Sequence, residues 1–336
     1  MTSYLQRPRW IFVLLILVGL GFIALANRVF NEYILSIITF VGISMILALS
    51  LNITNGFTGL FSLGHPAFMA IGGYVTAILT FPLNRKAMLL PDLYPWLAQI
   101  RIHFLPAMVI GGILAALTAF VIGVPVLRLR GHYLAVATMG FLIIVQVLIT
   151  NWDSVTRGPL GLNGLPALTN LWWVYFWVIA TFYVSWKIKF SSYGRSMFAI
   201  RENEMAAQCS GINLFRTRVA ALAIGAFFAG VAGGLWAHLI TAITPHSFSL
   251  IMAFHIVVMV VVGGMGSISG ACVAAVLCST ITEFFRPLEE RFEVYGIGEI
   301  SMALILILIL IYRPSGIFGS REPAFLIKEK LPGDYK

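Results

Sequence analysis

The sequence contains few charged residues, and no segment is polar enough to form a separate soluble domain. Only 10% of the 336 residues are charged, 60% are hydrophobic, and the mean hydropathy is +0.94. A soluble globular domain carries about 25% charged residues, so this composition excludes a water-soluble protein and requires lipid as the solvent. We therefore predict a single transmembrane domain over residues 1–336.

Asp, Glu, Lys and Arg are also absent from the centres of the apolar runs. Glu283 and Glu299 fall only at the ends of predicted spans, whereas proton- or ion-coupled carriers usually place such a group near the midplane. This argues against a secondary carrier, although sodium sites made of carbonyls and hydroxyls remain open. The chain also lacks a G-x-x-x-x-G-K-[ST] phosphate loop. If transport is driven by ATP, another subunit must therefore hydrolyse it.

Signals for disulfides, metals and nucleic acid are weak as well. Cys209, Cys272 and Cys278 form no CxxC pair, so we expect no disulfide and interpret them as small packing residues. No histidine has a second ligand at metal-binding spacing, and we predict neither a metal site nor a catalytic site. The net charge of +9 comes from basic residues spread between apolar runs, which favours membrane topology over nucleic-acid binding.

Ten apolar runs recur along the chain, and most are long enough to cross a hydrocarbon core of about 30 Å as helices. They are continuous rather than alternating, which excludes a transmembrane β-barrel. The eighth run has 14 residues, which is short for an upright span and predicts a broken or partly re-entrant helix. The predicted spans are 11–27, 34–51, 64–81, 107–127, 132–150, 172–186, 218–240, 250–263, 270–285 and 297–312.

The first run has two interpretations. Arg7 and Arg9, the apolar run 10–25 and the following small residues are typical of a signal peptide. The same residues also fit an uncleaved first transmembrane helix, which is the interpretation that we favour.

A polar segment at 187–218 interrupts the apolar pattern and carries six of the 22 Lys and Arg residues. With the N-terminus inside, ten spans place this segment and 15 of the 22 basic residues on the cytoplasmic side, and seven outside. That asymmetry fits the positive-inside rule, and one span more or fewer before Lys187 would reverse it. We therefore predict that both termini, including the tail at 313–336, are cytoplasmic.

Two segments rich in glycine and hydroxyl groups, 52–66 and 263–270, separate neighbouring spans. Both contain Gly at three-residue spacing followed by Ser, which hints at internal duplication, and Asn55-Gly56 is typical of a turn. Interrupted helices in two halves of a chain indicate a transport pathway or gate. The candidate pathway residues are Asn52, Asn55, Thr58, Ser62, His65, Ser267 and Ser269.

Close helix packing by small residues is the alternative explanation for glycine inside membrane spans. We expect packing, rather than transport, to account for three pairs of adjacent glycines: Gly72-Gly73, Gly111-Gly112 and Gly233-Gly234.

Five blocks of sequence, found in the same order over nearly the whole chain, resemble the LivM/LivH-type permeases. The longer chain and the Arg-Glu-Asn-Glu motif that begins at Arg201 are more similar to the LivM type. The blocks are FTGLFSLGHPAFMAIGGY (57–74), YGRSMFAIRENEMAAQCSGIN (193–213), AFFAGVAGG (226–234), VGGMGSISG (262–270) and RPSGIFG (313–319).

The resemblance implies an all-α permease of an ABC importer, with about ten transmembrane helices, in a bacterial inner membrane. Such a permease translocates branched-chain amino acids inward together with a second homologous permease, two cytoplasmic ATPase subunits and an extracytoplasmic substrate-binding protein. ATP and magnesium would be used by the ATPase subunits, and no cofactor by this chain. The alternatives are a urea or short-amide permease of the same family, a self-sufficient secondary carrier or channel, and a membrane scaffold or receptor.

The resemblance also implies that residues 195–213 carry the cytoplasmic loop that docks on an ATPase. The acidic residue of that loop is shifted one position early, to Glu204. The residues themselves predict one short helix over 196–210, with Arg201 and Glu204 close enough to pair, that fits either an ATPase groove or an anionic lipid surface. The candidate coupling residues are Arg195, Arg201, Glu202, Glu204, Ala206, Ala207 and Gly211.

Overall fold

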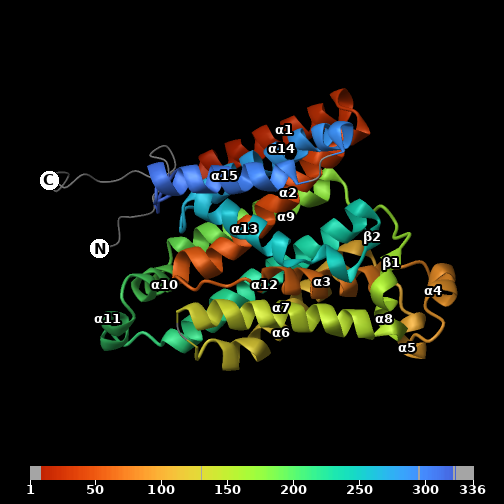
Figure 1. The fold of residues 1–336 in the computed structure, drawn as a ribbon, viewed down its shortest axis with the longest axis horizontal. Helices are drawn as coiled ribbons and strands as arrows, with labels where there is room; N and C mark the ends of the chain where they lie inside the picture. Colours follow the sequence, from red (N-terminus) through yellow and green to blue (C-terminus); the bar gives the residue numbers. More distant parts are fainter. Residues whose placement is uncertain (1–8, 130, 294–295, 321, 323–336) are drawn as a thin grey trace.

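The computed structural model describes residues 9–129, 131–293, 296–320 and 322. Its fold is a bundle of long helices that lie side by side, with successive helices running in opposite directions (Figure 1). The long helices are α1 (Arg9–Val29), α2 (Glu32–Leu51), α3 (His65–Thr80), α6 (Phe104–Val126), α7 (His132–Asn151), α9 (Leu171–Lys189), α12 (Leu214–Ile240), α13 (Leu250–Gly263), α14 (Ile268–Phe292) and α15 (Ile297–Tyr312).

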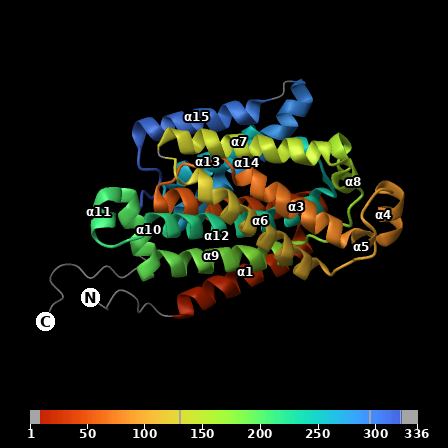
Figure 2. The same cartoon turned by 90° about the horizontal axis from the view of Figure 1, so that it is seen from below.

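Short elements cover the two ends of this bundle. One end carries α10 and α11, and the opposite end carries α4, α5, α8 and the pair β1–β2 (Figures 1 and 2). β1 and β2 are antiparallel, with Leu162 opposite Ile243. The short elements are η1 (Asn52–Phe57), α4 (Leu83–Leu89), α5 (Pro95–Ala98), α8 (Asp153–Thr156), η2 (Gly158–Leu160), β1 (Leu162–Asn163), α10 (Ser192–Glu202), α11 (Glu204–Cys209), β2 (Ala242–Ile243) and η3 (Pro245–Ser247).

Each of the ten predicted spans coincides with one long helix. By length and apolar composition, six segments of the described residues could cross a membrane, and the pair α3–α4, bent by 114°, would add a seventh. The six are Glu32–Phe57, Phe104–Val126, Tyr133–Asn151, Leu214–Ile240, Pro245–Gly263 and Ile268–Phe292. Shorter apolar helices, among them α15, complete the bundle. The prediction of an all-helical, multi-span membrane protein is confirmed.

Two spans differ from their predicted form. The eighth was expected to be broken because it had only 14 residues, but η3 precedes α13 and the whole segment Pro245–Gly263 has 19 residues. α14 continues beyond its predicted end to Phe292. Glu283 therefore lies in the interior of α14. The prediction that it lies at the end of a helix is wrong.

α1 packs against α9. Ile23 and Ala26 of α1 are buried against Leu171 of α9. A Cβ at Gly19 would also collide with the ring of Tyr175, because α1 and α9 approach closely there.

α12 is the central helix. In its most apolar stretch 78% of the residues are buried, against 33–56% for the other five candidate spans, and it packs on α2, α3 and α6. A Cβ at Gly72 would lie 2.2 Å from Gly230 Cα, and one at Gly233 would lie 1.9 Å from the Met69 carbonyl oxygen. Small residues allow helix backbones to approach closely in lipid. The predicted packing role of the adjacent glycine pairs is therefore confirmed.

We predict that Gly72→Ala destabilises the protein, because its new methyl group must displace the α12 backbone. Overpacking of this kind costs about 1–3 kcal/mol. Thermal unfolding of the purified protein in detergent should show a lower melting temperature. Gly140→Ala on α7 is the matched control, because no atom lies within 4 Å of the added methyl group. Equal melting temperatures for the two variants would contradict the packing role.

Candidate functional site

The first interruption of the bundle follows α2, which continues as the π-helix η1. π-helical turns are rare and frequently occur at functional sites. Asn55-Gly56 lies inside η1, so the turn predicted there is wrong; the backbone is left-handed only at Gly59, with φ of 72°. The Asn55 amide donates to the Ser62 carbonyl oxygen and accepts from the Ser62 amide, both at 3.3 Å. Asn55 therefore fixes the non-helical segment that leads to α3.

The second interruption lies between α13 and α14. Gly264 and Gly266 have φ of 104° and 90°, a conformation that is readily available only to glycine. Ser267 then begins α14 as its N-cap, and its Oγ accepts a hydrogen bond from the Gly270 amide at 3.0 Å. Such a cap satisfies one of the free amides at the start of the helix.

Asn52 joins the two interruptions. Its side-chain amide donates to the Ser267 carbonyl oxygen at 2.9 Å, and its carbonyl oxygen accepts from the Gly266 amide at 2.8 Å. Asn52 is 1% exposed, so these bonds are not exchanged with bulk water. Gly56 is required beside them, because a Cβ there would lie 1.8 Å from Asn52 Oδ1 and 2.6 Å from the Gly266 nitrogen.

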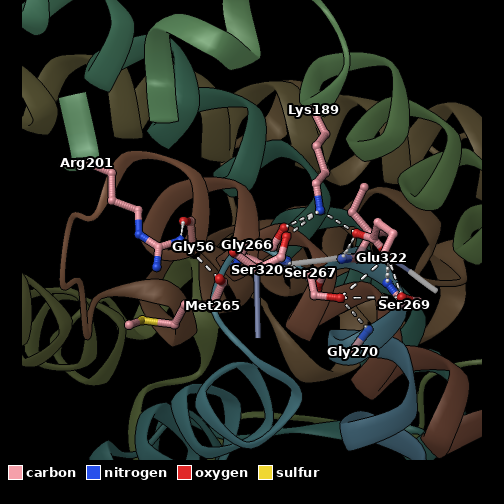
Figure 3. Close-up of polar contacts among 12 residues, drawn as sticks. Gly56, Lys189, Arg201, Met265, Gly266, Ser267, Ser269, Gly270, Ser320 and Glu322 are labelled. Carbon is pink, nitrogen blue, oxygen red and sulfur yellow. Dashed lines mark hydrogen bonds and ion pairs between the residues drawn. The ribbon is translucent and has the colours of Figure 1, made fainter. Parts of the chain in front are cut away.

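Arg201 connects both interruptions to α10 (Figure 3). Its Nη1 donates to the Gly56 carbonyl oxygen at 2.7 Å and to the Met265 carbonyl oxygen at 3.0 Å. A Cβ at Gly59 would lie 3.0 Å from Arg201 Cγ, and one at Gly266 would lie 2.8 Å from its Nη1. The glycines therefore leave the space through which the arginine side chain reaches the backbone.

Lys189 and Glu322 complete this polar cluster (Figure 3). Lys189 Nζ, at the end of α9, donates to the Gly266 carbonyl oxygen at 2.7 Å and pairs with Glu322 Oε1 at 2.6 Å. Glu322 accepts from the backbone amides of Ile268 and Ser269 at 2.6 and 3.1 Å, and also from the Ser269 hydroxyl. A carboxylate at a helix N-terminus is stabilised by free amides and by the helix dipole. Glu322 thus fixes the start of α14.

The segment that follows α15 also pairs with the second interruption. The amides of Ile317 and Phe318 donate to the carbonyl oxygens of Val262 and Gly263 at 2.9 and 3.2 Å. This pairing brings Glu322 to the start of α14, and the sequence alone did not identify Glu322 or Lys189 as site residues. One signal in the sequence could have pointed to this region. The RPSGIFG block at 313–319, just before Glu322, lacks helical periodicity and therefore indicates a non-helical segment.

The predicted coupling loop folds as two helices and not as one. Asn203, with φ of −158° and ψ of 110°, separates α10 from α11, and its side-chain oxygen accepts from the Ala206 amide at 3.1 Å. Asparagine favours such capping positions because its short side chain competes for nearby backbone groups. The prediction of a single helix over 196–210 is therefore wrong.

The predicted pair between Arg201 and Glu204 is also wrong. Arg201 donates to backbone carbonyls, and Glu204 forms its salt bridge with Arg218 near the start of α12. Arg218 is 8% exposed. The acidic residue that is shifted by one position therefore fixes α11 to the central helix.

The other coupling candidates differ in exposure. Ala207 is 3% exposed and packs inward, whereas Met205 is 68% exposed. Arg195, Glu202, Ala206 and Gly211 are exposed. Cys209 of α11 is exposed as well, so its expected packing role is wrong, while Cys278 is buried. α10 and α11 therefore present an accessible surface on which Met205 is the most exposed large apolar side chain.

The remaining pathway candidates do not join the cluster. The Thr58 hydroxyl donates to the Thr54 carbonyl oxygen at 2.6 Å, and His65 Nε2 lies 2.7 Å from Ser50 Oγ. His65 is 2% exposed, and its Nδ1 has no hydrogen-bond partner in the described part of the chain. Of the seven candidates, the cluster thus unites Asn52, Ser267 and Ser269, while Asn55 and Ser62 bond to each other.

No metal site is apparent in the ranges that the structure describes, where no group of three or more His, Cys, Asp or Glu could hold an ion. His238 illustrates why a membrane histidine need not be a ligand. Its Nε2 lies 2.9 Å from Thr80 Oγ1 and its Nδ1 lies 3.0 Å from the Pro166 carbonyl oxygen, so both ring nitrogens have structural partners.

Long apolar helices, with a polar helix α10 bonded to the two segments that join α2 to α3 and α13 to α14, define a multi-span membrane protein. Residues 33–312 match the family described as the branched-chain amino acid transport system permease component. The chain belongs to this family, and it is a permease component and not an enzyme. No solved structure matches the chain.

Individual relatives agree with the LivM-type resemblance. The high-affinity branched-chain amino acid transport system permease protein LivM of Escherichia coli is 30% identical over 87% of this chain and 71% of its own length. The probable LivM of Methanocaldococcus jannaschii is 22% identical over 86% of this chain and 94% of its own. The LivH permease of Escherichia coli is 26% identical over 82% of this chain and 91% of its own length.

We predict that Glu322→Gln lowers stability, because it removes the charge that pairs with Lys189 and caps α14. The loss of a buried charged hydrogen-bond partner costs about 1–3 kcal/mol. The melting temperature in detergent should fall, and amide hydrogen exchange should rise at the start of α14. Glu202→Gln is the control, since Glu202 is exposed and forms no salt bridge in the described part of the chain. An unchanged exchange rate at Ile268 and Ser269 would contradict the capping role.

Proposed function

We propose that this chain is one permease subunit of an ATP-binding cassette importer that moves leucine, isoleucine and valine into the cell. The family match and the printed functions of the LivM and LivH relatives support the substrate class. The single observation that carries the mechanism is the position of Arg201. It lies on the exposed helix α10 and binds the backbone of both interruptions.

The proposed mechanism is mechanical coupling. An ATPase subunit binds α10 and α11, and its movement on ATP binding and hydrolysis displaces these helices. Arg201 and Lys189 are hydrogen-bonded to the backbone of the interruptions, and Asn52 joins the two interruptions to each other. Displacement of α10 and the end of α9 therefore moves the backbone at 56 and 265–267. The long helices that follow each interruption then change the side of the membrane to which the pathway is open.

The complex requires further subunits. We infer a second homologous permease, two cytoplasmic ATPase subunits and an extracytoplasmic substrate-binding protein, in line with the existence of LivM and LivH permeases in one kind of transport system. ATP and magnesium act at the ATPase subunits. Because the binding protein selects the substrate, the permease itself can bind the substrate weakly.

The distribution of basic residues supports one orientation in the membrane. We propose a bacterial inner-membrane location with both termini, α10 and α11 on the cytoplasmic side, since the basic residues favour that side under the positive-inside rule. The interruptions lie at the same end of the bundle as α10, because Arg201 reaches both. The end with α4, α5 and the β1–β2 pair then faces the binding protein.

We predict that Arg201→Gln uncouples transport. Leucine uptake by the reconstituted complex should fall about tenfold or more, because each charge-assisted hydrogen bond contributes roughly 1.5–3 kcal/mol. ATPase subunits should still co-purify with the variant, because the exposed face of α10 and α11 is unchanged. Arg128→Gln is the control, as Arg128 is an exposed arginine at the end of α6. Normal uptake by the Arg201 variant would contradict the mechanism.

We predict that Cys209 reports both orientation and docking, because it is the exposed cysteine of α11. A membrane-impermeant maleimide should label it in inside-out vesicles and not in right-side-out vesicles. Bound ATPase subunits should protect it, and Cys209→Ser should abolish the signal. Labelling from the outside would contradict the orientation, and labelling unaffected by the ATPases would contradict the docking site.

A further inference from the structure

A groove opens between helices at the end of the bundle opposite α10. It has a volume of about 480 Å³ and lies among the first half of α2, the end of α12, the start of α13 and the middle of α14. Tyr33, Trp236 and Met252 form part of its wall, and Glu283 and Arg286 stand on its α14 side. Its volume falls in the usual range of small-molecule sites, about 300–1,000 Å³.

A smaller cavity of about 70 Å³ continues this groove towards the core, and the two share Phe40, Trp236 and Met252. Ser44, His255 and Ser279 line the cavity. Ser279 is 1% exposed, and its hydroxyl has no hydrogen-bond partner in the described ranges. A buried polar group without a partner is costly, which indicates that a ligand or water supplies the missing bond.

The charges beside the groove are of both signs. Glu283 and Arg286 are one helical turn apart, with their charged atoms 3.3 Å from each other. The Glu283 side chain is 12% exposed and that of Arg286 is 62% exposed. A weak, partly exposed pair of this kind contributes little to stability. A charged ligand can therefore bind these side chains in place of their mutual contact with little loss of folding free energy.

We propose that the groove and its inner cavity bind a zwitterionic amino acid with an apolar side chain. Glu283 receives the ammonium group, Arg286 receives the carboxylate, and the wall around Trp236 and Met252 receives the aliphatic side chain. This proposal rests on the proposed function, and it places the substrate at the end that faces the binding protein. A neutral urea or short amide would leave both charges unused.

The test is protection of an introduced thiol in the full-length chain, held in lipid nanodiscs. Ser36 is exposed and lines the groove, so Ser36→Cys in a Cys209→Ser background gives a reactive thiol at the site. Leucine should slow its labelling by a small methanethiosulfonate several-fold, and urea should not. Leucinamide and isocaproate, which each lack one charge, should protect more weakly. Met88→Cys is the control, because Met88 is 82% exposed on α4 and lies outside the groove.

Charge variants make the test specific. Glu283→Gln and Arg286→Gln should each raise the half-protecting leucine concentration about tenfold, which corresponds to about 1.4 kcal/mol. Glu290→Gln, an exposed position on the same helix, should leave it unchanged. Labelling that leucine does not slow, or that lipid blocks in every condition, overturns the proposal. ATP-driven leucine uptake by the reconstituted complex keeps the two hypotheses apart: uptake without protection refutes only this site, and protection without uptake refutes only the proposed function.

Discussion

The structure depends on one constraint, which is that backbone groups freed by an interrupted helix must find hydrogen-bond partners where water is scarce. Both interruptions expose carbonyl oxygens, and cationic side chains bind them: Arg201 binds Gly56 and Met265, and Lys189 binds Gly266. The donors come from α9 and α10. The interruptions therefore cannot rearrange without breaking bonds to the end of α9 or to α10, or moving together with them.

The two ends of the bundle differ in their polar features. At one end, polar bonds tie α10 and the end of α9 to the interruptions, and close glycine contacts join α12 to α3. At the other end lies a groove with a charged pair, and the cavity beside it holds a buried hydroxyl that has no partner in the described part of the chain. α2 belongs to both, because it lines the groove with its first half and continues into η1 with its last residue. It is the direct connection between the proposed solute site and the polar cluster.

The sequence predicted the parts that depend on local composition. Continuous apolar runs located the long helices, and adjacent glycines marked the crossings of α12, because both signals are set by neighbouring residues. The sequence also located both interruptions. It could not predict which donors satisfy them, since Arg201 is 145 residues from Gly56 and Asn52 is 215 from Ser267. Glu204 illustrates the same limit: proximity on one helix suggested Arg201, but the break at Asn203 turns Glu204 towards Arg218.

The most direct measurement is amide hydrogen exchange in the assembled transporter, with and without ATP. If Arg201 transmits movement, ATP should change exchange in 52–64 and 264–270 of the unmodified protein. In Arg201→Gln these changes should disappear, while ATP still alters exchange in α11. Changes of the same size in both proteins would contradict the account, because the interruptions would then respond to ATP without their bond to α10.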